Sequence, residues 1–129
     1  MARVTTSRRF ATSPEDMWKR IGGFGSLHEW HPAVTSTAVT ASGQGRELVT
    51  TDGGRIVETL LDNGPSHYSY RIDQSALPFA TLVSTLRVLS DLGGCVVEWD
   101  AEFEPLGVSA TDAANSARQF LQTGLDALQ

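Results

Sequence analysis

The sequence contains very little lysine and cysteine, and each shortage excludes a class of function. Lys19 is the one lysine among ten basic residues, so chemistry that requires two lysines is excluded. Cys95 is the one cysteine, so no intrachain disulfide can form and nothing indicates an oxidising compartment. Because Cys95 begins a short apolar run, we interpret it as a small buried hydrophobic residue. The pair Arg8-Arg9 is not followed by the apolar segment of an export signal, and no membrane span is evident, so we expect a cytoplasmic location.

Long apolar runs and an excess of positive charge are also missing from the sequence. No stretch approaches the roughly 18 apolar residues of a membrane span, so we expect no membrane insertion. Ten basic residues face 15 acidic ones, which gives a formal net charge of −5. An acidic chain has no basic face to neutralise phosphates, so nucleic acid is not an expected partner. The length of 129 residues predicts a single domain over residues 1–129 and leaves the oligomeric state open.

The first quarter of the sequence predicts one strand and two short helices. Residues 4–11 are rich in β-branched side chains, which favours a strand. Ser13 and Pro14 are typical of a helix start, and the two acids that follow suit the positive end of the helix dipole. The glycine pair at residues 22–23 ends this helix, and a second short helix is predicted over residues 24–30.

From residue 33 onward the pattern changes to strands separated by turn residues. Turn signals such as Asp52-Gly53-Gly54 favour tight hairpins, so consecutive strands are expected to pair antiparallel. The predicted strands are residues 34–41, 46–51, 55–61, 67–73, 79–90 and 95–104. With the first strand added, they form a seven-stranded sheet.

The last predicted strand alternates between apolar and acidic residues. Its apolar positions are Val97, Trp99, Ala101 and Phe103, and its acidic positions are Glu98, Asp100, Glu102 and Glu104. This alternation predicts one buried face and one solvated face, so we interpret the acids as a solvated row and not as a metal site. A final long helix is predicted over residues 110–128, where apolar residues recur at helical spacing and form one stripe.

This order of elements, together with several motifs, resembles the START-like or Bet v 1-like superfamily, in particular its small bacterial members of the polyketide cyclase/dehydratase-like group. The motifs that carry the resemblance include Ser13-Pro14-Glu15-Asp16-Met17-Trp18, Trp30-His31-Pro32-Ala33-Val34, Gly45-Arg46-Glu47-Leu48 and Trp99-Asp100-Ala101-Glu102-Phe103-Glu104-Pro105. The resemblance covers essentially the whole chain.

The resemblance implies an α+β helix-grip fold. In this fold a curved, seven-stranded antiparallel sheet wraps around a long C-terminal helix, and two short helices follow strand 1. The space between sheet and helix is an apolar cavity that holds lipids, sterols, polyketides or plant hormones in relatives. Small residues on the predicted long helix, such as Ala117 and Gly124, would leave room for such a cavity, although they also permit close packing.

The resemblance also implies a set of ligand-binding residues. If Ile56, Glu58 and Leu60 share the inner face of their strand, a carboxylate points at the helix. A glutamate in the same context contacts the ligand through water in plant hormone receptors that the chain resembles, and His31 falls near their pocket lysine. The expected ligand-binding residues are Trp30, His31, Glu58, Leu60, Tyr68, Tyr70, Phe79, Leu82, Ser84, Trp99, Ala117, Phe120 and Leu121.

Three functions remain open at this point. The first is binding of a small hydrophobic or aromatic molecule, such as a lipid or polyketide, in the cavity. The second is a polyketide cyclase/dehydratase-type enzyme in which Glu58 and His31 act as acid and base, because burial tunes the pKa values of such pairs. The third is an interaction module with a vestigial cavity. Alternatively, Glu58 and His31 have only a structural role or lie on the surface.

Other sites and roles are not expected. His28 and His31 are three residues apart instead of the four of a zinc-protease helix, and no third ligand is evident, so we expect neither a metal nor a cofactor. The gate motif of the hormone receptors is replaced by residues 51–54, and their latch motif by residues 77–79. These differences argue against hormone signalling, although the Gly53-Gly54 pair would still suit a flexible lid.

Overall fold

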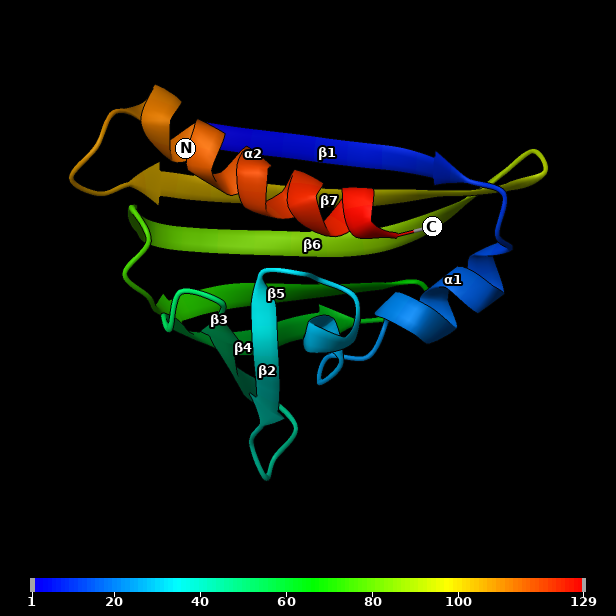
Figure 1. The fold of residues 1–129 in the computed structure, drawn as a ribbon, viewed down its shortest axis with the longest axis horizontal. Helices are drawn as coiled ribbons and strands as arrows, with labels where there is room; N and C mark the ends of the chain where they lie inside the picture. Colours follow the sequence, from blue (N-terminus) through cyan, green and yellow to red (C-terminus); the bar gives the residue numbers. More distant parts are fainter. Residues whose placement is uncertain (1, 129) are drawn as a thin grey trace.

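The computed structural model describes residues 2–128, and its main feature is one curved antiparallel sheet (Figure 1). The seven predicted strands are present, in the order β1-β7-β6-β5-β4-β3-β2. Their bounds are β1 (Ala2–Phe10), β2 (Val34–Val39), β3 (Gly45–Thr50), β4 (Arg55–Asn63), β5 (His67–Gln74), β6 (Phe79–Asp91) and β7 (Gly94–Pro105). Strands β2 to β7 follow one another as hairpins, and β1 pairs with the last of them.

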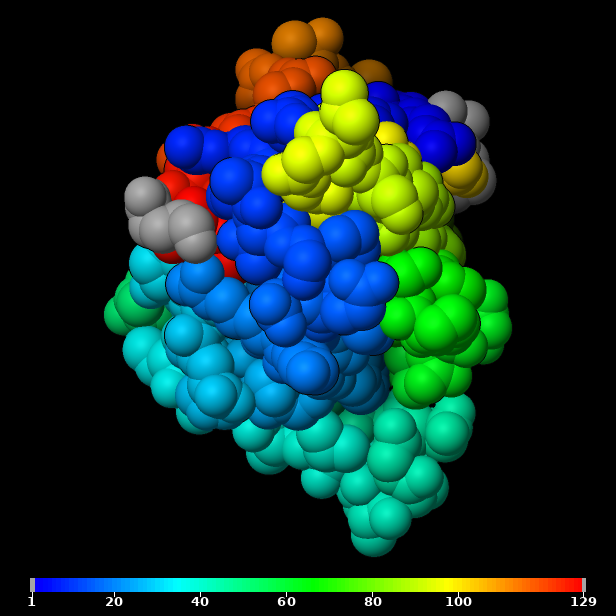
Figure 2. All heavy atoms as spheres, turned by 90° about the vertical axis from the view of Figure 1, so that its right-hand side faces the viewer, coloured from blue at the N-terminus to red at the C-terminus, as the bar shows by residue number. Residues whose placement is uncertain are grey.

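The helix after β1 forms as predicted, but the second short helix is reduced to a single turn. In α1 (Pro14–Ile21), the Ser13 hydroxyl accepts a hydrogen bond from the Asp16 backbone N–H at 3.2 Å. The predicted helix over residues 24–30 is instead the 3₁₀ turn η1 (Leu27–Glu29). Glycine is the poorest helix former after proline, and the three glycines at residues 22, 23 and 25 disfavour a longer helix. In Figure 2, α1 and residues 22–30 close one end of the molecule.

The long helix α2 (Ala110–Ala127) packs along β1 and β7, on the concave side of the sheet (Figure 1). Its first turn is capped by the Ser109 hydroxyl, which accepts from the Asp112 backbone N–H at 3.1 Å. Its buried stripe consists of Ala113, Ala117, Leu121, Gly124 and Leu125. No helix among residues 2–128 is long and apolar enough to cross a membrane.

The alternation of β7 is confirmed with one exception on the acidic face. The four apolar side chains are buried against α2, as predicted. Asp100, however, is 5% exposed instead of solvated. Arg3 of β1 and Arg87 of β6 reach it from the two neighbouring strands, at 3.1 and 3.4 Å. A strand between two others shares its outer face with long side chains, and these cover the shorter aspartate.

Irregular strand pairing adds to the curvature of the sheet around β4 and β5. The register shifts between Val57 and Glu58 and again between Leu60 and Asp62 where β4 pairs with β5, and a further shift occurs at the start of β6. Such bulges bend a strand and increase its twist. Figure 1 shows β2 and β3 running across the direction of β6 and β7. Because α2 is straight, the sheet and the helix separate on the β4–β5 side, and this separation positions the site.

Candidate functional site

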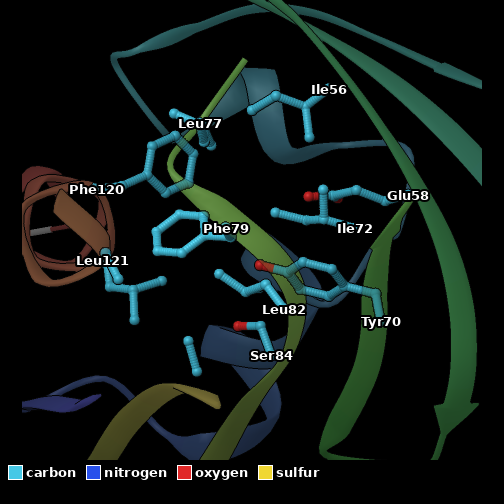
Figure 3. Close-up of a pocket in the computed structure, with 12 residues that line it drawn as sticks. Ile56, Glu58, Tyr70, Ile72, Leu77, Phe79, Leu82, Ser84, Phe120 and Leu121 are labelled. Atoms are coloured by element: carbon cyan, nitrogen blue, oxygen red, sulfur yellow. The ribbon is translucent and has the colours of Figure 1, made fainter. Parts of the chain in front are cut away.

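A small apolar cavity lies between the concave face of the sheet and α2 (Figure 3). Its volume is about 30 Å³, which is room for about two water molecules. The residues that line it are Ile56, Glu58, Tyr70, Ile72, Leu77, Phe79, Leu82, Ser84, Ala101, Ala117, Phe120 and Leu121. The cavity is thus where the resemblance implies it, but side chains nearly fill it.

Local periodicity explains which side chains reach the cavity. Side chains two apart share one face of a strand, so Ile56 and Glu58 of β4 point the same way, as do Leu82 and Ser84 of β6. Residues three and four apart share one face of a helix, which brings α2 positions 117, 120 and 121 together. In Figure 3 the Tyr70 hydroxyl points toward the middle of the cavity.

The predicted ligand-binding residues divide into two groups. Eight of them line the cavity: Glu58, Tyr70, Phe79, Leu82, Ser84, Ala117, Phe120 and Leu121. Five do not: Trp30, His31, Leu60, Tyr68 and Trp99. The expected acid–base pair is therefore divided, because Glu58 lines the cavity and His31 does not.

The carboxylate of Glu58 forms a buried ion pair with Arg46, a residue that the sequence analysis did not single out. The Arg46 Nε and Glu58 Oε1 atoms are 2.7 Å apart, and the two side chains are 0% and 3% exposed. The two residues are direct cross-strand partners on β3 and β4. A signal existed in the sequence: Arg46 is two residues from Leu48, which is buried as well, so both belong to one face.

Aromatic rings surround the Arg46 guanidinium. Its central carbon lies 4.3 Å from the ring centroid of Phe24, 4.8 Å from that of Tyr70 and 5.4 Å from that of Tyr68. Its Nη1 donates to the Phe24 carbonyl at 2.8 Å and to the Tyr68 hydroxyl at 3.3 Å. Within residues 2–128, its Nη2 has no hydrogen-bond partner. Ring faces attract a cation, so the cage offsets part of the cost of burying this charge.

Burial dominates the acid–base properties of the groups around the ion pair. It raises the pKa of the Glu58 carboxyl, and the neighbouring Arg46 opposes that shift. It also raises the pKa of the Tyr70 hydroxyl, which lines the cavity, so that this group stays protonated and can donate a hydrogen bond. The Ser84 hydroxyl donates to the Asp100 carbonyl at 2.6 Å, which leaves only its lone pairs for other partners.

His31 is buried outside the cavity and is bonded to backbone at both ring nitrogens. Its Nε2 lies 2.8 Å from the carbonyl oxygen of Phe120, and its Nδ1 lies 3.1 Å from the backbone nitrogen of Ala33. A carbonyl can only accept and a backbone N–H can only donate, so Nε2 carries the proton and Nδ1 is bare. Burial lowers the pKa of this imidazole. The geometry thus holds His31 in one neutral tautomer.

An outer groove lies next to the cavity. Its volume is about 300 Å³. It is lined by Ala33, Thr50, Thr51, Asp52, Gly54, Arg55, Ile56, Ala76, Leu77 and Phe120. Because Ile56, Leu77 and Phe120 line both spaces, these three side chains separate them. In the part of the chain that the structure describes, no cluster of three or more His, Cys, Asp or Glu side chains suits a metal ion.

Solved structures similar to this chain share its whole architecture. The protein XoxI from Bacillus cereus is 36% identical with a TM-score of 0.97, and the match covers 100% of this chain and 94% of that one. An uncharacterised protein from Bacillus thuringiensis is 35% identical with a TM-score of 0.95, covering 99% and 96%. A START superfamily protein from Mycobacterium smegmatis is 15% identical with a TM-score of 0.79, covering 97% and 92%, and shows the fold alone.

The comparison with family models agrees with the fold. No curated protein matches the sequence. The model described as polyketide cyclase / dehydrase and lipid transport matches residues 1–129. The resemblance to the START-like or Bet v 1-like superfamily and the helix-grip fold that it implies are thereby confirmed. The chain belongs to the polyketide cyclase/dehydrase and lipid transport family.

Proposed function

We propose that the protein binds a small hydrophobic or aromatic molecule between the sheet and α2 and holds it without chemical change. The observation that carries this proposal is an apolar cavity into which the Glu58 carboxylate and the Tyr70 hydroxyl project. A few polar groups in an otherwise apolar wall are the usual composition of a small-molecule site. The family, whose description includes lipid transport, supports the same function. The cytoplasmic location remains a prediction.

Binding requires the cavity to enlarge. Small-molecule pockets measure roughly 300–1,000 Å³, whereas this cavity measures about 30 Å³. Displacement of Phe120 and Leu77, both half-buried, would join it to the outer groove of about 300 Å³. The joined space would fall within the usual range, so the ligand-bound form differs from this one mainly in these two side chains.

The polar groups of the cavity favour a neutral ligand that carries a hydrogen-bond donor. An ionised Glu58 accepts hydrogen bonds, and the Ser84 hydroxyl has only lone pairs to offer. The Tyr70 hydroxyl is hydrogen-bonded to Ser84. Because Ser84 donates its own proton to Asp100, Tyr70 is the donor of that bond and offers a ligand its lone pairs. A ligand with a hydroxyl or an N–H group satisfies Glu58, whereas a carboxylate placed beside it would be repelled at short range in a low-dielectric site.

The test uses N-phenyl-1-naphthylamine, a neutral aromatic dye with one N–H donor. We expect its fluorescence to rise on saturable binding to the wild-type protein. Ala117→Leu adds volume to the cavity wall and should weaken binding at least tenfold, whereas Ala110→Leu, at an exposed position of the same helix, should not. Equal affinities in the two variants would contradict binding in this cavity.

The alternative functions have less support in the geometry. Acid–base catalysis by Glu58 and His31 requires both groups at one ligand, but both nitrogens of His31 are bonded to backbone and Glu58 is paired with Arg46. An interaction module with a vestigial cavity agrees with the small cavity volume. Failure of the wild-type protein and of all the variants to bind the neutral dye would favour that module.

A further inference from the structure

His31 holds Phe120 in place at two points. Its Nε2–H donates to the Phe120 carbonyl at 2.8 Å. The two rings are also stacked, with centroids 4.2 Å apart and an angle of 25° between their planes. The hydrogen bond orients the backbone of Phe120 and the stack orients its side chain, so one imidazole sets both.

The surroundings of His31 keep the imidazole itself from moving. Its Nδ1 accepts from the Ala33 backbone N–H at 3.1 Å. On the α2 side, Gly124 leaves the space that the ring occupies: a Cβ there would lie 2.6 Å from His31 Cδ2 and 2.9 Å from Trp99 Cζ3. Trp99 packs edge-on against the imidazole, with ring centroids 5.9 Å apart. The ring is therefore fixed at both nitrogens and on two sides.

Phe120 is one of the three side chains that separate the cavity from the outer groove. In Figure 3 its ring reaches from α2 toward Leu77 and Phe79. We infer that His31 is a positioning residue that holds Phe120 in the closed position and so limits the rate at which a ligand reaches the cavity. This inference rests on the proposed function, since it concerns access to the same cavity.

Opening the cavity to the outer groove then has a defined free-energy cost. The Phe120 ring must leave the imidazole stack before a ligand passes. A stacked aromatic pair and a buried hydrogen bond together account for roughly a tenfold change in an equilibrium constant. Because Phe120 is displaced in the bound form as well, weakening the contact should increase both the association rate and the affinity of a ligand by about the same factor.

The experiment measures the association rate of N-phenyl-1-naphthylamine by stopped-flow fluorescence, after thermal unfolding has shown that each variant is folded. His31→Gln keeps an amide donor but loses the stack, and Gly124→Ala leaves the imidazole in the chain but displaces it. Phe120→Ala removes the barrier itself. His67→Gln, at a half-buried imidazole that is bonded to Asp62 and lines neither the cavity nor the outer groove, is the matched control.

The expected result is roughly threefold faster association in His31→Gln, which loses the stack alone. Gly124→Ala, which disturbs both the stack and the hydrogen bond, should associate about tenfold faster, and His67→Gln should keep the wild-type rate. In the Phe120→Ala background, neither substitution should accelerate binding further. Wild-type rates in both His31→Gln and Gly124→Ala would overturn the role of His31, and a wild-type rate in Phe120→Ala would overturn the barrier. If no variant, Phe120→Ala included, binds the dye, the proposed function fails and this inference fails with it.

Discussion

A buried ion pair lies in the sheet and a buried imidazole lies against α2, and the two differ in charge. On the sheet side, Arg46 and Glu58 form an ion pair inside an aromatic cage. On the helix side, neutral His31 bonds only to backbone groups. A buried charge that loses its partner is far more costly than a neutral group that loses one hydrogen bond. The comparison therefore predicts a rigid sheet side and a more easily opened helix side.

The largest expected effect comes from breaking the ion pair. Arg46→Met leaves the Glu58 carboxylate buried without a counter-charge, and we expect a loss of about 3–5 kcal/mol in the free energy of unfolding. Urea unfolding followed by tryptophan fluorescence measures this loss. The double variant Arg46→Met/Glu58→Leu removes both charges and should recover most of it, since apolar pairs often replace buried ion pairs without penalty. If Arg46→Met alone loses less than about 1 kcal/mol, the ion pair does not make the sheet side more rigid than the helix side.

The next effect concerns the packing of α2 on the helix side. Gly124→Ala places a Cβ 2.6 Å from His31 Cδ2. We expect a net destabilisation of about 1–2 kcal/mol, because the strain of overpacking exceeds the gain in helix propensity. Thermal unfolding of this variant is compared with that of Gln119→Ala, an exposed position on α2. Equal unfolding midpoints of Gly124→Ala and Gln119→Ala would mean that the His31 ring moves aside without an energetic cost.

The pH dependence of the free energy of unfolding further distinguishes the helix side, which contains His31, from the sheet side. Burial lowers the pKa of His31 below its usual 6.5, so the unfolded chain binds this proton first as the pH falls. The contribution of neutral His31 to stability is complete above pH 6.5 and declines below it, by at most about 1.4 kcal/mol per pH unit. Chemical unfolding of wild type and His31→Gln from pH 7.5 to 5.5 measures this decline. A decline of the same slope in both proteins would assign it to other groups.

The smallest effect is expected on the outer face. Arg55 pairs with Glu47 at 2.5 Å, but both side chains are exposed. Exposed ion pairs are screened by solvent and restrict two flexible side chains, so Arg55→Ala should leave the unfolding midpoint unchanged. A marked loss of stability in Arg55→Ala would show that burial does not explain why the Arg46–Glu58 pair stabilises the protein more than the exposed Arg55–Glu47 pair.

Much of the fold was predictable from the sequence, because its signals are local. The alternation of β7 identified the side that faces α2, and the apolar neighbours of Glu58 identified it as an inward-facing acid. The exception on β7, Asp100, is buried by arginines from the two adjacent strands. A pattern within one strand contains no information about what its neighbours place beside it.

The site was predictable only in part, for the same reason. Arg46 shares a face with Leu48, yet its role depends on the strand register that places it opposite Glu58. The resemblance places His31 among the ligand-binding residues, because it falls near the pocket lysine of the hormone receptors. A loop has no periodicity to indicate a direction, and the structure turns this imidazole toward the backbone of α2.

The sequence by itself determined the order of the elements, the apolar faces of the strands and the stripe of the long helix, since these follow from periods of two and 3.6 residues. Tertiary structure alone decided the partner of Glu58, the position of Phe120 and the cavity volume of about 30 Å³. These depend on bulges, on register and on side chains contributed by β4, β5, β6, β7 and α2 at once. Local propensity specifies each element, whereas the space between elements is set by how all of them pack.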